Sequence, residues 1–394
     1  MRVLRNRWIF RVKYLADEEN ERSKAPVVIK GYLQEFGIDY REIFSSVVRL
    51  ETLRVLFTLA AIWEYDIDQM DVTTAFLNGS IDVEVFMEHP EEYYVRHLRK
   101  SLYGLKQAPR VWFRLLKEFL ENAGYGLINC EACVAVKVIN GWLIIISIYV
   151  DDLIFFPPNK SMMKDMEEML FERFKMKNLG RIHYILGWEI TRNRQKRTLF
   201  ISQREYAEKV LQRFSMENCD DLKLSKVMCP STRDEKALMK DKPYRAVRGS
   251  LMYLMLGTRP DLAYMVRECS QILKTPGVLH WRAPKRGLRY LKETFDMGLQ
   301  LGGDQSDRLL NQHLVAFADA DFANRVDDRK SVAGFLTQLC GSTISWCSQT
   351  ERAVDLHTCE AEYMALSLLV QEVIYLRQIA LLLNKSHQKF MWMW

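Results

Sequence analysis

An apolar stretch of the chain runs from Trp142 to Phe155, and two adjacent carboxylates, Asp151 and Asp152, interrupt it. The stretch is rich in β-branched residues and too short to span a bilayer, so it predicts a buried β-hairpin with acid at its turn. Two aspartates in such a place cost several kcal/mol unless they are neutralised, and a divalent metal ion bound through oxygen ligands would neutralise them. A turn that uses Asp only as a turn-forming residue is the alternative, which the apolar strands on both sides disfavour.

Short strands and a helix are predicted before this hairpin. The pattern indicates two strands of a basic flap (8–14 and 26–33) joined by a polar turn (17–24), then a helix (49–65) and a strand (65–72). On that last strand apolar and acidic residues alternate, and Asp71 lies on the side opposite Met70 and Val72. A third acid therefore stands at the end of a predicted strand.

A basic loop leads into an amphipathic helix between this strand and the hairpin. Pro109 sits at the start of the helix, and Lys106 and Arg110 flank its amino terminus. Backbone N–H groups at such a terminus attract anions. The loop is therefore a candidate anion site, with a solvated basic loop as the alternative.

Mostly helical sequence follows the hairpin. The predicted elements are a helix (160–175), a hairpin (184–190 and 198–201) around a basic turn (192–197), helices between 202 and 297, three strands (314–320, 331–339 and 343–348) and a last helix (359–383). Irregular stretches at 219–243 and 302–311 predict linkers. We therefore expect three parts of the chain: 1–220, 221–310 and 311–394.

Composition changes this picture little. The chain has 394 residues, enough for two or three domains, and the apolar and charged fractions of a soluble globular protein. A net charge of +6 leans only weakly toward polyanionic partners. Eight scattered cysteines, with one CxxC pair (Cys130 and Cys133), favour a reduced, intracellular compartment over a disulfide framework or a zinc site. The basic amino terminus does not resemble a secretory signal, and we expect no segment long enough to cross a membrane.

The acids Asp71, Asp151 and Asp152 are far apart in sequence, yet each lies at the end of an apolar strand. A strand, a helix and a hairpin of this kind can pack as one antiparallel sheet, with the three carboxylates clustered at an exposed edge. Two-metal phosphoryl transfer needs this arrangement, in which carboxylates hold two Mg²⁺ ions that activate a hydroxyl and stabilise a leaving pyrophosphate. One acid alone would indicate little.

Several stretches of the chain match, in order, those of one known family. They include KGYLQEFGIDYREIF from Lys30, QMDVTTAFLNG from Gln69, SLYGLKQAPRVWF from Ser101, YVDDL from Tyr149, LGWEI from Leu186 and ADADFANRVDDRKSVAGFL from Ala318. Through them the chain resembles the reverse transcriptase and ribonuclease H segment of the Pol polyprotein of copia-type long-terminal-repeat retrotransposons. The resemblance covers nearly the whole chain. It implies an α+β fold: a right-hand polymerase with fingers and palm (1–220), a mostly helical thumb and connection (221–310), and a truncated ribonuclease H-like domain (311–394).

The resemblance also implies roles for the three acids and for one aromatic residue. Asp71 matches the first palm aspartate, and Asp151 and Asp152 match the YxDD pair, so all three would be catalytic and would bind two Mg²⁺ ions, with Mn²⁺ as a substitute. Phe76 matches a steric gate whose ring would exclude a ribose 2′-hydroxyl. A deoxynucleotide preference follows from that match.

Four further residues match motifs that contact substrates in the family. Lys106 and Gln107, in the LKQAP loop, would contact the incoming nucleotide. Leu186 and Gly187 resemble the turn that grips the primer terminus.

In the last part of the chain, Asp319 matches the first ribonuclease H aspartate and Glu360 the glutamate at the start of the helix. Both would bind Mg²⁺ for cleavage of the RNA strand of a hybrid. For Glu360, a favourable acid in the first turn of a helix is an equal alternative.

Three departures from the family pattern change the functional expectation. Pro26 stands where the family has an arginine that holds the triphosphate, so nucleotide binding should be weaker. Cys359 precedes the glutamate of the last motif. The remaining ribonuclease H aspartates lie beyond the stretch that ends with the short tail MWMW, so we expect the ribonuclease H part to be inactive.

The sequence therefore predicts an RNA-directed DNA polymerase of a retrotransposon that acts on an RNA template, a DNA primer or hybrid, and deoxynucleoside triphosphates. The alternative is a catalytically inactive relic that binds nucleic acid. Integrase and protease segments would be partners in a full element. The expected location is the cytoplasm, in virus-like particles, with the nucleus as a second compartment and no membrane association.

Overall fold

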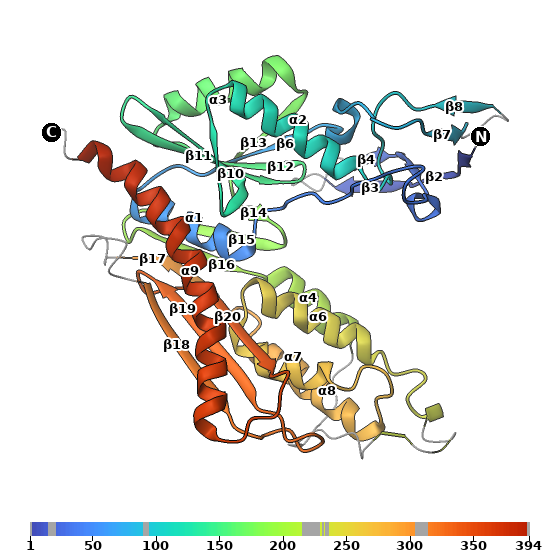
Figure 1. Ribbon diagram of the computed structural model, residues 1–394, viewed down its shortest axis with the longest axis vertical. Helices are drawn as coiled ribbons and strands as arrows, with labels where there is room; N and C mark the ends of the chain where they lie inside the picture. The colour runs from blue at the N-terminus through green and yellow to red at the C-terminus, as the bar shows by residue number, and fades with distance from the viewer. Residues whose placement is uncertain are drawn as a thin grey trace. The chain divides into compact units, whose positions relative to one another are not determined.

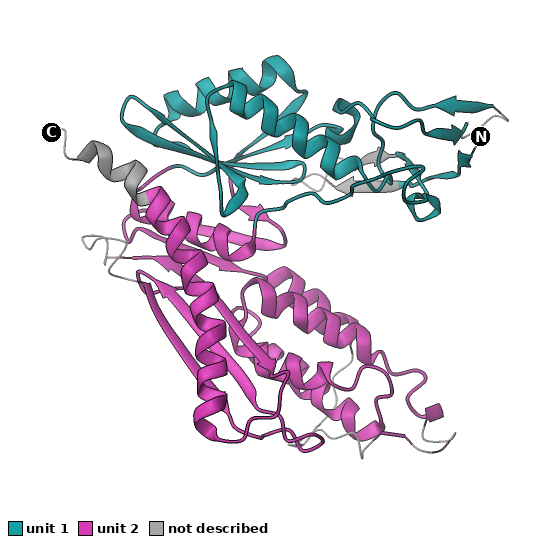
Figure 2. Ribbon diagram, viewed as in Figure 1, with its two compact units in different colours: residues 1–48, 66–181 teal, residues 49–65, 182–394 magenta. Residues whose placement is uncertain are grey.

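The computed structural model describes residues 2–14, 21–89, 94–214, 229–230, 232, 236–303 and 314–391. The mixed α/β chain forms two compact units (Figure 2): unit 1 comprises residues 1–48 and 66–181, and unit 2 comprises residues 49–65 and 182–394. The two predicted domain boundaries, 220/221 and 310/311, fall outside the described residues and stay predictions.

A six-stranded antiparallel sheet forms the centre of unit 1, in the order β13-β6-β12-β11-β10-β9 (Figure 1). Its strands are β6 (Asp68–Val72), β9 (Gly126–Ile128), β10 (Glu131–Ile139), β11 (Trp142–Tyr149), β12 (Asp152–Phe156) and β13 (Met176–Arg181). Strands β11 and β12 are the predicted acidic hairpin, and their apolar residues from Leu143 to Ile148 and from Leu153 to Phe156 are all buried. The prediction of a buried hairpin is therefore confirmed.

Two helices cover one face of this sheet, α2 (Ala108–Asn122) and α3 (Lys160–Arg173) (Figure 1). Their buried residues recur at helical spacing: Trp112, Leu116 and Leu120 on α2, and Met163, Met166 and Leu170 on α3. The ring of Trp112 packs edge-on against that of Phe174, which follows α3. Both predicted helices are confirmed.

Short strands make up the remainder of unit 1. Strand β2 (Asn6–Trp8) pairs with β5 (Val27–Ile29), β3 (Arg11–Tyr14) pairs with β4 (Glu21–Lys24), and β1 (Val3–Leu4), β7 (Phe86–Glu88) and β8 (Val95–His97) form a small sheet. The predicted flap is confirmed in outline, but two details are wrong. Glu21–Lys24 pair as a strand because β3 lies opposite them, and the second strand ends at Ile29, before a 3₁₀ turn, η1 (Gly31–Leu33). The centre of the predicted turn, 17–20, lies outside the described residues.

Unit 2 contains a four-stranded antiparallel sheet, β14-β15-β16-β17, against which helix α1 (Leu50–Ile62) packs. Its strands are β14 (Tyr184–Ile185), β15 (Trp188–Asn193), β16 (Thr198–Ser202) and β17 (Gly298–Gly302). The predicted single strand over 184–190 is broken at Leu186 and Gly187, which form a turn. Strand β17 was not predicted, because a short segment with glycine at both ends gives little periodic signal.

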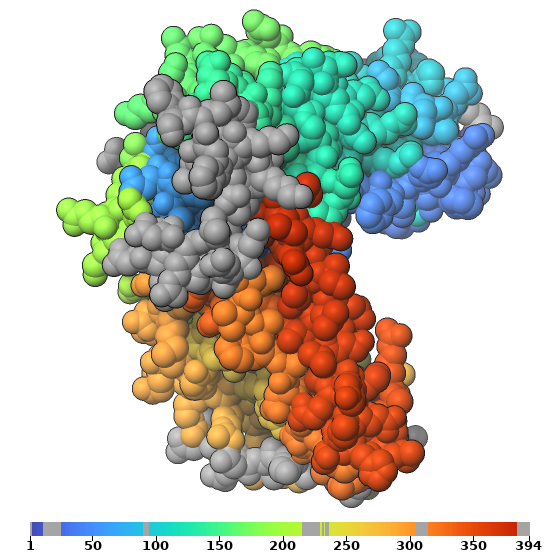
Figure 3. Space-filling model, turned by 60° about the vertical axis from the view of Figure 1, so that its left-hand side comes forward, coloured from blue at the N-terminus to red at the C-terminus, as the bar shows by residue number. Residues whose placement is uncertain are grey.

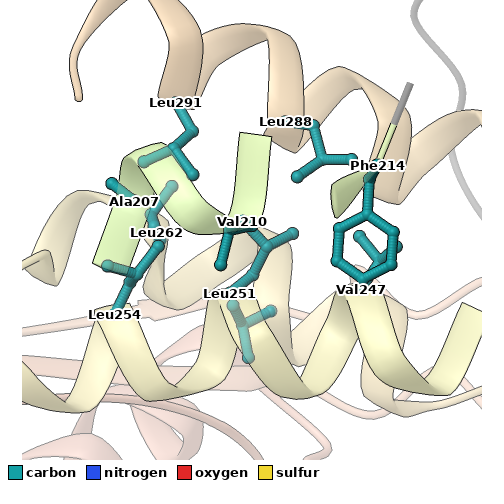
Figure 4. Close-up of a cluster of buried hydrophobic side chains, with 10 residues drawn as sticks. Ala207, Val210, Phe214, Val247, Leu251, Leu254, Leu262, Leu288 and Leu291 are labelled. Atoms are coloured by element: carbon teal, nitrogen blue, oxygen red, sulfur yellow. The ribbon is translucent and has the colours of Figure 1, made fainter. Parts of the chain in front are cut away.

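In the described residues between β16 and β17, four helices converge on one apolar core: α4 (Arg204–Arg213), α6 (Tyr244–Gly257), α7 (Ala263–Ser270) and α8 (Val278–Glu293). Figure 4 shows side chains from α4, α6 and α8 meeting at its centre, among them Val210, Leu251 and Leu288. The predicted helical character of 202–297 is confirmed where the residues are described.

The last part of unit 2 is a three-stranded antiparallel sheet of β18 (Leu314–Asp321), β19 (Val332–Leu339) and β20 (Ser342–Thr350), with helix α9 (Thr358–Met391) packed on β18 and β19. One side of α9 is buried through Ala361, Ala365, Leu369, Leu376 and Ile379. The red atoms of this helix also lie openly at the molecular surface (Figure 3).

Helix α9 corrects one sequence expectation. Its segment Thr358–Leu383 is long and apolar enough to cross a membrane by length and composition, so the expectation that no segment has that length is wrong. The apolar residues of this helix also pack on the sheet. The core helix of a globular unit passes the same test of length and composition as a membrane-spanning helix.

A buried arginine joins three elements of unit 2. Arg54 of α1 is 1% exposed, and its guanidinium donates to the carbonyls of Ile344 (2.8 Å), Leu256 and Gly257 (2.9 Å). Its Cζ also lies 4.1 Å from the ring centroid of Trp346. Burial lowers the pKa of Arg54 to about 10, against the opposing effect of Glu51, so the group stays charged at neutral pH.

We expect Arg54→Met to lower the free energy of unfolding by about 3 kcal/mol, because it leaves buried carbonyls without a donor. Equilibrium urea unfolding followed by circular dichroism measures this loss. Arg282→Met, at an exposed position on α8, is the matched control. Equal losses in the two variants would show that the carbonyl contacts of Arg54 contribute nothing particular.

Candidate functional site

The acidic hairpin turns through only two residues, Val150 and Asp151, because Tyr149 and Asp152 are already paired across the ladder. Val150 adopts a φ of 55°, in the left-handed region. Glycine or asparagine is usual there, and a β-branched residue is strained by its Cβ. Surrounding contacts must therefore hold this turn in place.

Hydrogen bonds to both carbonyls of the turn hold it. The indole Nε1–H of Trp112 donates to the Val150 carbonyl at 2.8 Å, and the Val72 N–H donates to the Asp151 carbonyl at 3.0 Å. Trp112 thus fixes the turn from helix α2 and Val72 fixes it from strand β6. Sequence reasoning recognised Trp112 only as an apolar residue of an amphipathic helix, since its partner is 38 residues away.

Strand pairing brings Asp71 and Asp152 together. They are direct partners in the antiparallel pairing of β6 and β12, so their side chains lie on the same face of the sheet. The Gln69 amide donates to Asp152 Oδ1 at 3.1 Å. Lys177 of β13 stands opposite Asp71 on the other side of β6. The expected clustering of acids therefore has a concrete basis in the register, and Lys177 is a neighbour that the sequence did not reveal.

The surroundings of Asp151 shift the pKa of its carboxyl. Burial raises the pKa of its carboxyl, the hydrogen bond from Tyr103 opposes that rise, and the negative charges of Asp71 and Asp152 add to it. The Tyr103 hydroxyl donates to Asp151 Oδ2 at 2.7 Å. Asp151 Oδ1 is buried and has no hydrogen-bond partner among the described residues.

This donor set suits a hard divalent cation. Magnesium prefers carboxylate oxygens, and the unpartnered Oδ1 of Asp151 is the kind of buried acceptor that a cation would satisfy. In the described part of the chain, however, no three His, Cys, Asp or Glu side chains are already placed to hold a metal ion. The residues fit the ion by the chemistry of their oxygens and by the backbone register that sets Asp71 opposite Asp152.

Phe76 lies close to this cluster. It belongs to the 3₁₀ turn η2 (Ala75–Asn78), which follows β6 through Thr74 at a φ of 56°, and it is 8% exposed. Its ring centroid is 4.4 Å from that of Tyr103. The same tyrosine therefore touches both Phe76 and Asp151, and sequence reasoning gave it no role.

Lys106 and Gln107 are held by the segment from Gln34 to Tyr40. The Gln107 amide donates to the Asp39 carbonyl and accepts from the Gln34 amide, both at 3.0 Å. Lys106 Nζ donates to the Gln34 carbonyl and to the Tyr40 hydroxyl, both at 3.2 Å. These contacts anchor the loop, and the predicted nucleotide contacts of both residues stay predictions.

The predicted anion site at the start of α2 is partly neutralised, because Arg110 forms an ion pair with Glu42.

In unit 2, Leu186 and Gly187 form the two-residue turn between β14 and β15, with φ values of 52° and 79°. The Tyr253 hydroxyl donates to the Leu186 carbonyl at 2.7 Å. A Cβ at Gly187 would lie 2.3 Å from that hydroxyl oxygen, so only glycine fits. The predicted turn is confirmed as a conformation, and its contact with a primer stays a prediction.

The two remaining predicted residues, Asp319 and Glu360, are exposed in unit 2. Asp319 lies opposite Gly334 in the β18–β19 pair. Glu360 Oε2 accepts a hydrogen bond from the Leu356 N–H, just before α9, at 2.7 Å. Glu360 lies in the first turn of α9, as the alternative to metal binding requires, and its metal-binding role stays a prediction.

Near the same helix start, two carboxylates that the sequence did not single out are buried. Glu351 and Asp355 are each 5% exposed, and their four oxygens find no partner outside the pair. Burial, then a hydrogen bond and repulsion from Asp355, raises the pKa of Glu351 to about 7.

Comparison with known proteins agrees with this geometry. Residues 1–227 match the family described as reverse transcriptase (RNA-dependent DNA polymerase). The chain is 41% identical to the retrovirus-related Pol polyprotein from transposon TNT 1-94 of Nicotiana tabacum, over 98% of this chain and 30% of that protein. It is 35% and 34% identical to the corresponding polyproteins from transposons RE2 and RE1 of Arabidopsis thaliana, over 92% of this chain and 25% of each. The chain thus spans less than a third of the length of these relatives.

The Glu351–Asp355 pair predicts a pH dependence of stability. The folded pKa of Glu351, about 7, lies above the unfolded value of roughly 4.3, so the folded state binds the proton more tightly. The stabilisation is fully present below the unfolded value and is lost as pH rises through about 7. The melting temperature should therefore fall across this window. Glu351→Gln should flatten the plot of melting temperature against pH, and the exposed control Glu362→Gln should not. Parallel plots for wild type and Glu351→Gln would contradict the assignment of this pH dependence to Glu351.

Proposed function

We propose that this chain, which belongs to the reverse transcriptase (RNA-dependent DNA polymerase) family, catalyses RNA-templated DNA synthesis for a copia-type retrotransposon. The observation that carries the proposal is the register of unit 1, which sets Asp71 directly opposite Asp152 and places Asp151 on the adjoining turn. Three carboxylates lie at the same end of neighbouring strands, and one of them has a buried oxygen without a partner among the described residues. They suit a reaction that depends on divalent cations.

In this proposal Asp71, Asp151 and Asp152 would hold two Mg²⁺ ions. When bound, the ions would supply a Lewis acid for the attacking 3′-hydroxyl and for the leaving pyrophosphate. The chain orients these carboxylates through β6, β12 and the tethered turn, so little rearrangement of the backbone is needed. Phe76 stands beside them as the gate against a ribose 2′-hydroxyl, and the substrates would be an RNA template, a DNA primer and deoxynucleoside triphosphates.

Other parts of the chain take supporting roles in the proposal. Lys106 and Gln107 would order the loop beneath the incoming nucleotide, and Leu186 and Gly187 would contact the primer end. In this proposal residues 1–220 would form fingers and palm, residues 221–310 the thumb and connection, and residues 311–394 a ribonuclease H-like part. Glu360 lies in the first turn of α9 and accepts from the Leu356 N–H, which supports a structural role for that residue rather than ribonuclease H cleavage.

The presence of Pro26 is the reason to expect weak binding of the nucleotide. It is exposed beside β5, and its carbonyl accepts the Ile9 N–H at 3.0 Å, which extends the β2–β5 pairing. A proline offers no positive charge to a triphosphate, so affinity for the nucleotide should depend on other groups.

Primer extension on an RNA template with Mg²⁺ tests the proposed function. We expect Asp151→Asn to reduce the rate at least about 100-fold, because it removes a charged ligand from the cluster. Asp165→Asn, at an exposed position on α3, is the control and should extend normally. Extension that survives Asp151→Asn would contradict the proposal, and salt-sensitive hybrid binding by wild type without any product would favour the inactive-relic alternative.

The tether on the acidic turn predicts a second effect. Trp112→Phe keeps an aromatic ring but removes the N–H that donates to Val150, so the strained turn should loosen. We expect the extension rate to fall about tenfold, since small misplacements of catalytic groups are costly. Trp142→Phe, at the exposed start of β11, is the control. Equal rates for both variants would show that the turn holds its shape without the indole.

A further inference from the structure

Tyr103 contacts two residues of the proposed site at once. Its hydroxyl donates to Asp151 Oδ2 at 2.7 Å, and its ring centroid lies 4.4 Å from that of Phe76. The two residues would perform different tasks, one as a metal ligand and the other as the sugar gate. One side chain is therefore placed to affect both tasks by separate atoms, the hydroxyl and the ring.

The loop that carries Tyr103 is anchored away from the acids. The Tyr103 carbonyl accepts the Ile29 N–H at 2.9 Å, and Gly104, at a φ of 99°, packs so closely that a Cβ there would lie 2.1 Å from the Ile29 carbonyl oxygen. The buried amide of Gln107 fixes the next turn of the same loop. Because β5 and the segment after it hold the loop, Tyr103 does not depend on Asp151 for its own position.

The hydrogen bond has a definite consequence for Asp151. It occupies Oδ2 and thereby fixes the rotation of the carboxylate, while Oδ1 stays buried without a partner in the described part of the chain. Oδ1 is then the oxygen left for a cation.

We propose that Tyr103 is a positioning residue with two separable actions: its hydroxyl selects Oδ1 of Asp151 as the metal-binding oxygen, and its ring supports Phe76 as the sugar gate. The inference rests on the proposed polymerase function for the identity of the metal and the nucleotide. Groups that hydrogen-bond to a metal-binding carboxylate orient it, and their loss commonly weakens metal affinity.

Binding of Mn²⁺ alone tests the first action without any catalysis. In a titration of the full chain, followed by the electron paramagnetic resonance signal of free Mn²⁺, Tyr103→Phe should weaken binding about tenfold and Asp151→Asn at least as much. Tyr125→Phe removes a hydroxyl from another buried tyrosine of unit 1 and should leave Mn²⁺ affinity unchanged. Unchanged or tighter binding in Tyr103→Phe would overturn the first action.

Selection between deoxynucleotides and ribonucleotides tests the second action. Tyr103→Phe keeps the ring and should leave the ratio of the two kcat/KM values unchanged, whereas Tyr103→Ala removes the ring and should lower it about tenfold. Phe76→Val, which removes the gate itself, marks the full effect. A ratio that changes in Tyr103→Phe, or that stays constant in a folded Tyr103→Ala, would overturn the second action.

The two assays separate this inference from the proposed function. If wild type binds Mn²⁺ and Tyr103→Phe binds it more weakly, but no variant extends a primer, the proposed function fails and the metal-positioning action stands. If wild type extends primers and Tyr103→Phe matches it in Mn²⁺ affinity, the positioning action fails and the proposed function stands.

Discussion

A two-residue turn held by hydrogen bonds to both of its carbonyls is the constraint on which the candidate site depends. Val150 adopts a conformation that its side chain disfavours, and Asp151 follows it directly. The indole of Trp112 and the amide of Val72 hold this turn, and strand pairing then places Asp71 beside Asp152. The position of three carboxylates thus follows from backbone geometry, which is stiffer than the side chains themselves.

The carboxylates of the site carry an electrostatic cost in the folded chain. Burial is the largest cause of the raised pKa of Asp151, and the negative charges of Asp71 and Asp152 add to it. Gln69 and Tyr103 each donate to one of these carboxylates, and the remaining imbalance is the free energy that a cation would relieve on binding. The electrostatic cost of the carboxylates without a cation and their affinity for a cation would therefore come from the same interactions.

Local patterns predicted much of this architecture. The acidic hairpin, the two helices over the sheet and the helical stretch of unit 2 were readable because each has a strong period of its own. The clustering of Asp71 with Asp152 followed from strand ends. Contacts between distant segments left no such signal: Tyr103 with Asp151, Trp112 with Val150, and the pairing of β17 with β16 exist only once the chain has folded. The residue types alone did not predict these contacts.

The place of α1 in unit 2 has a consequence for the order of folding during synthesis. Arg54 donates to the carbonyl of Ile344, 290 residues later in the chain, and Thr52 bonds to Tyr375, 323 residues later. At a translation rate of about 5–20 residues per second, the helix leaves the ribosome roughly 15–60 seconds before these partners exist. During that interval its apolar faces and its guanidinium lack their native neighbours, so α1 is a segment of the nascent chain that a chaperone would have reason to cover.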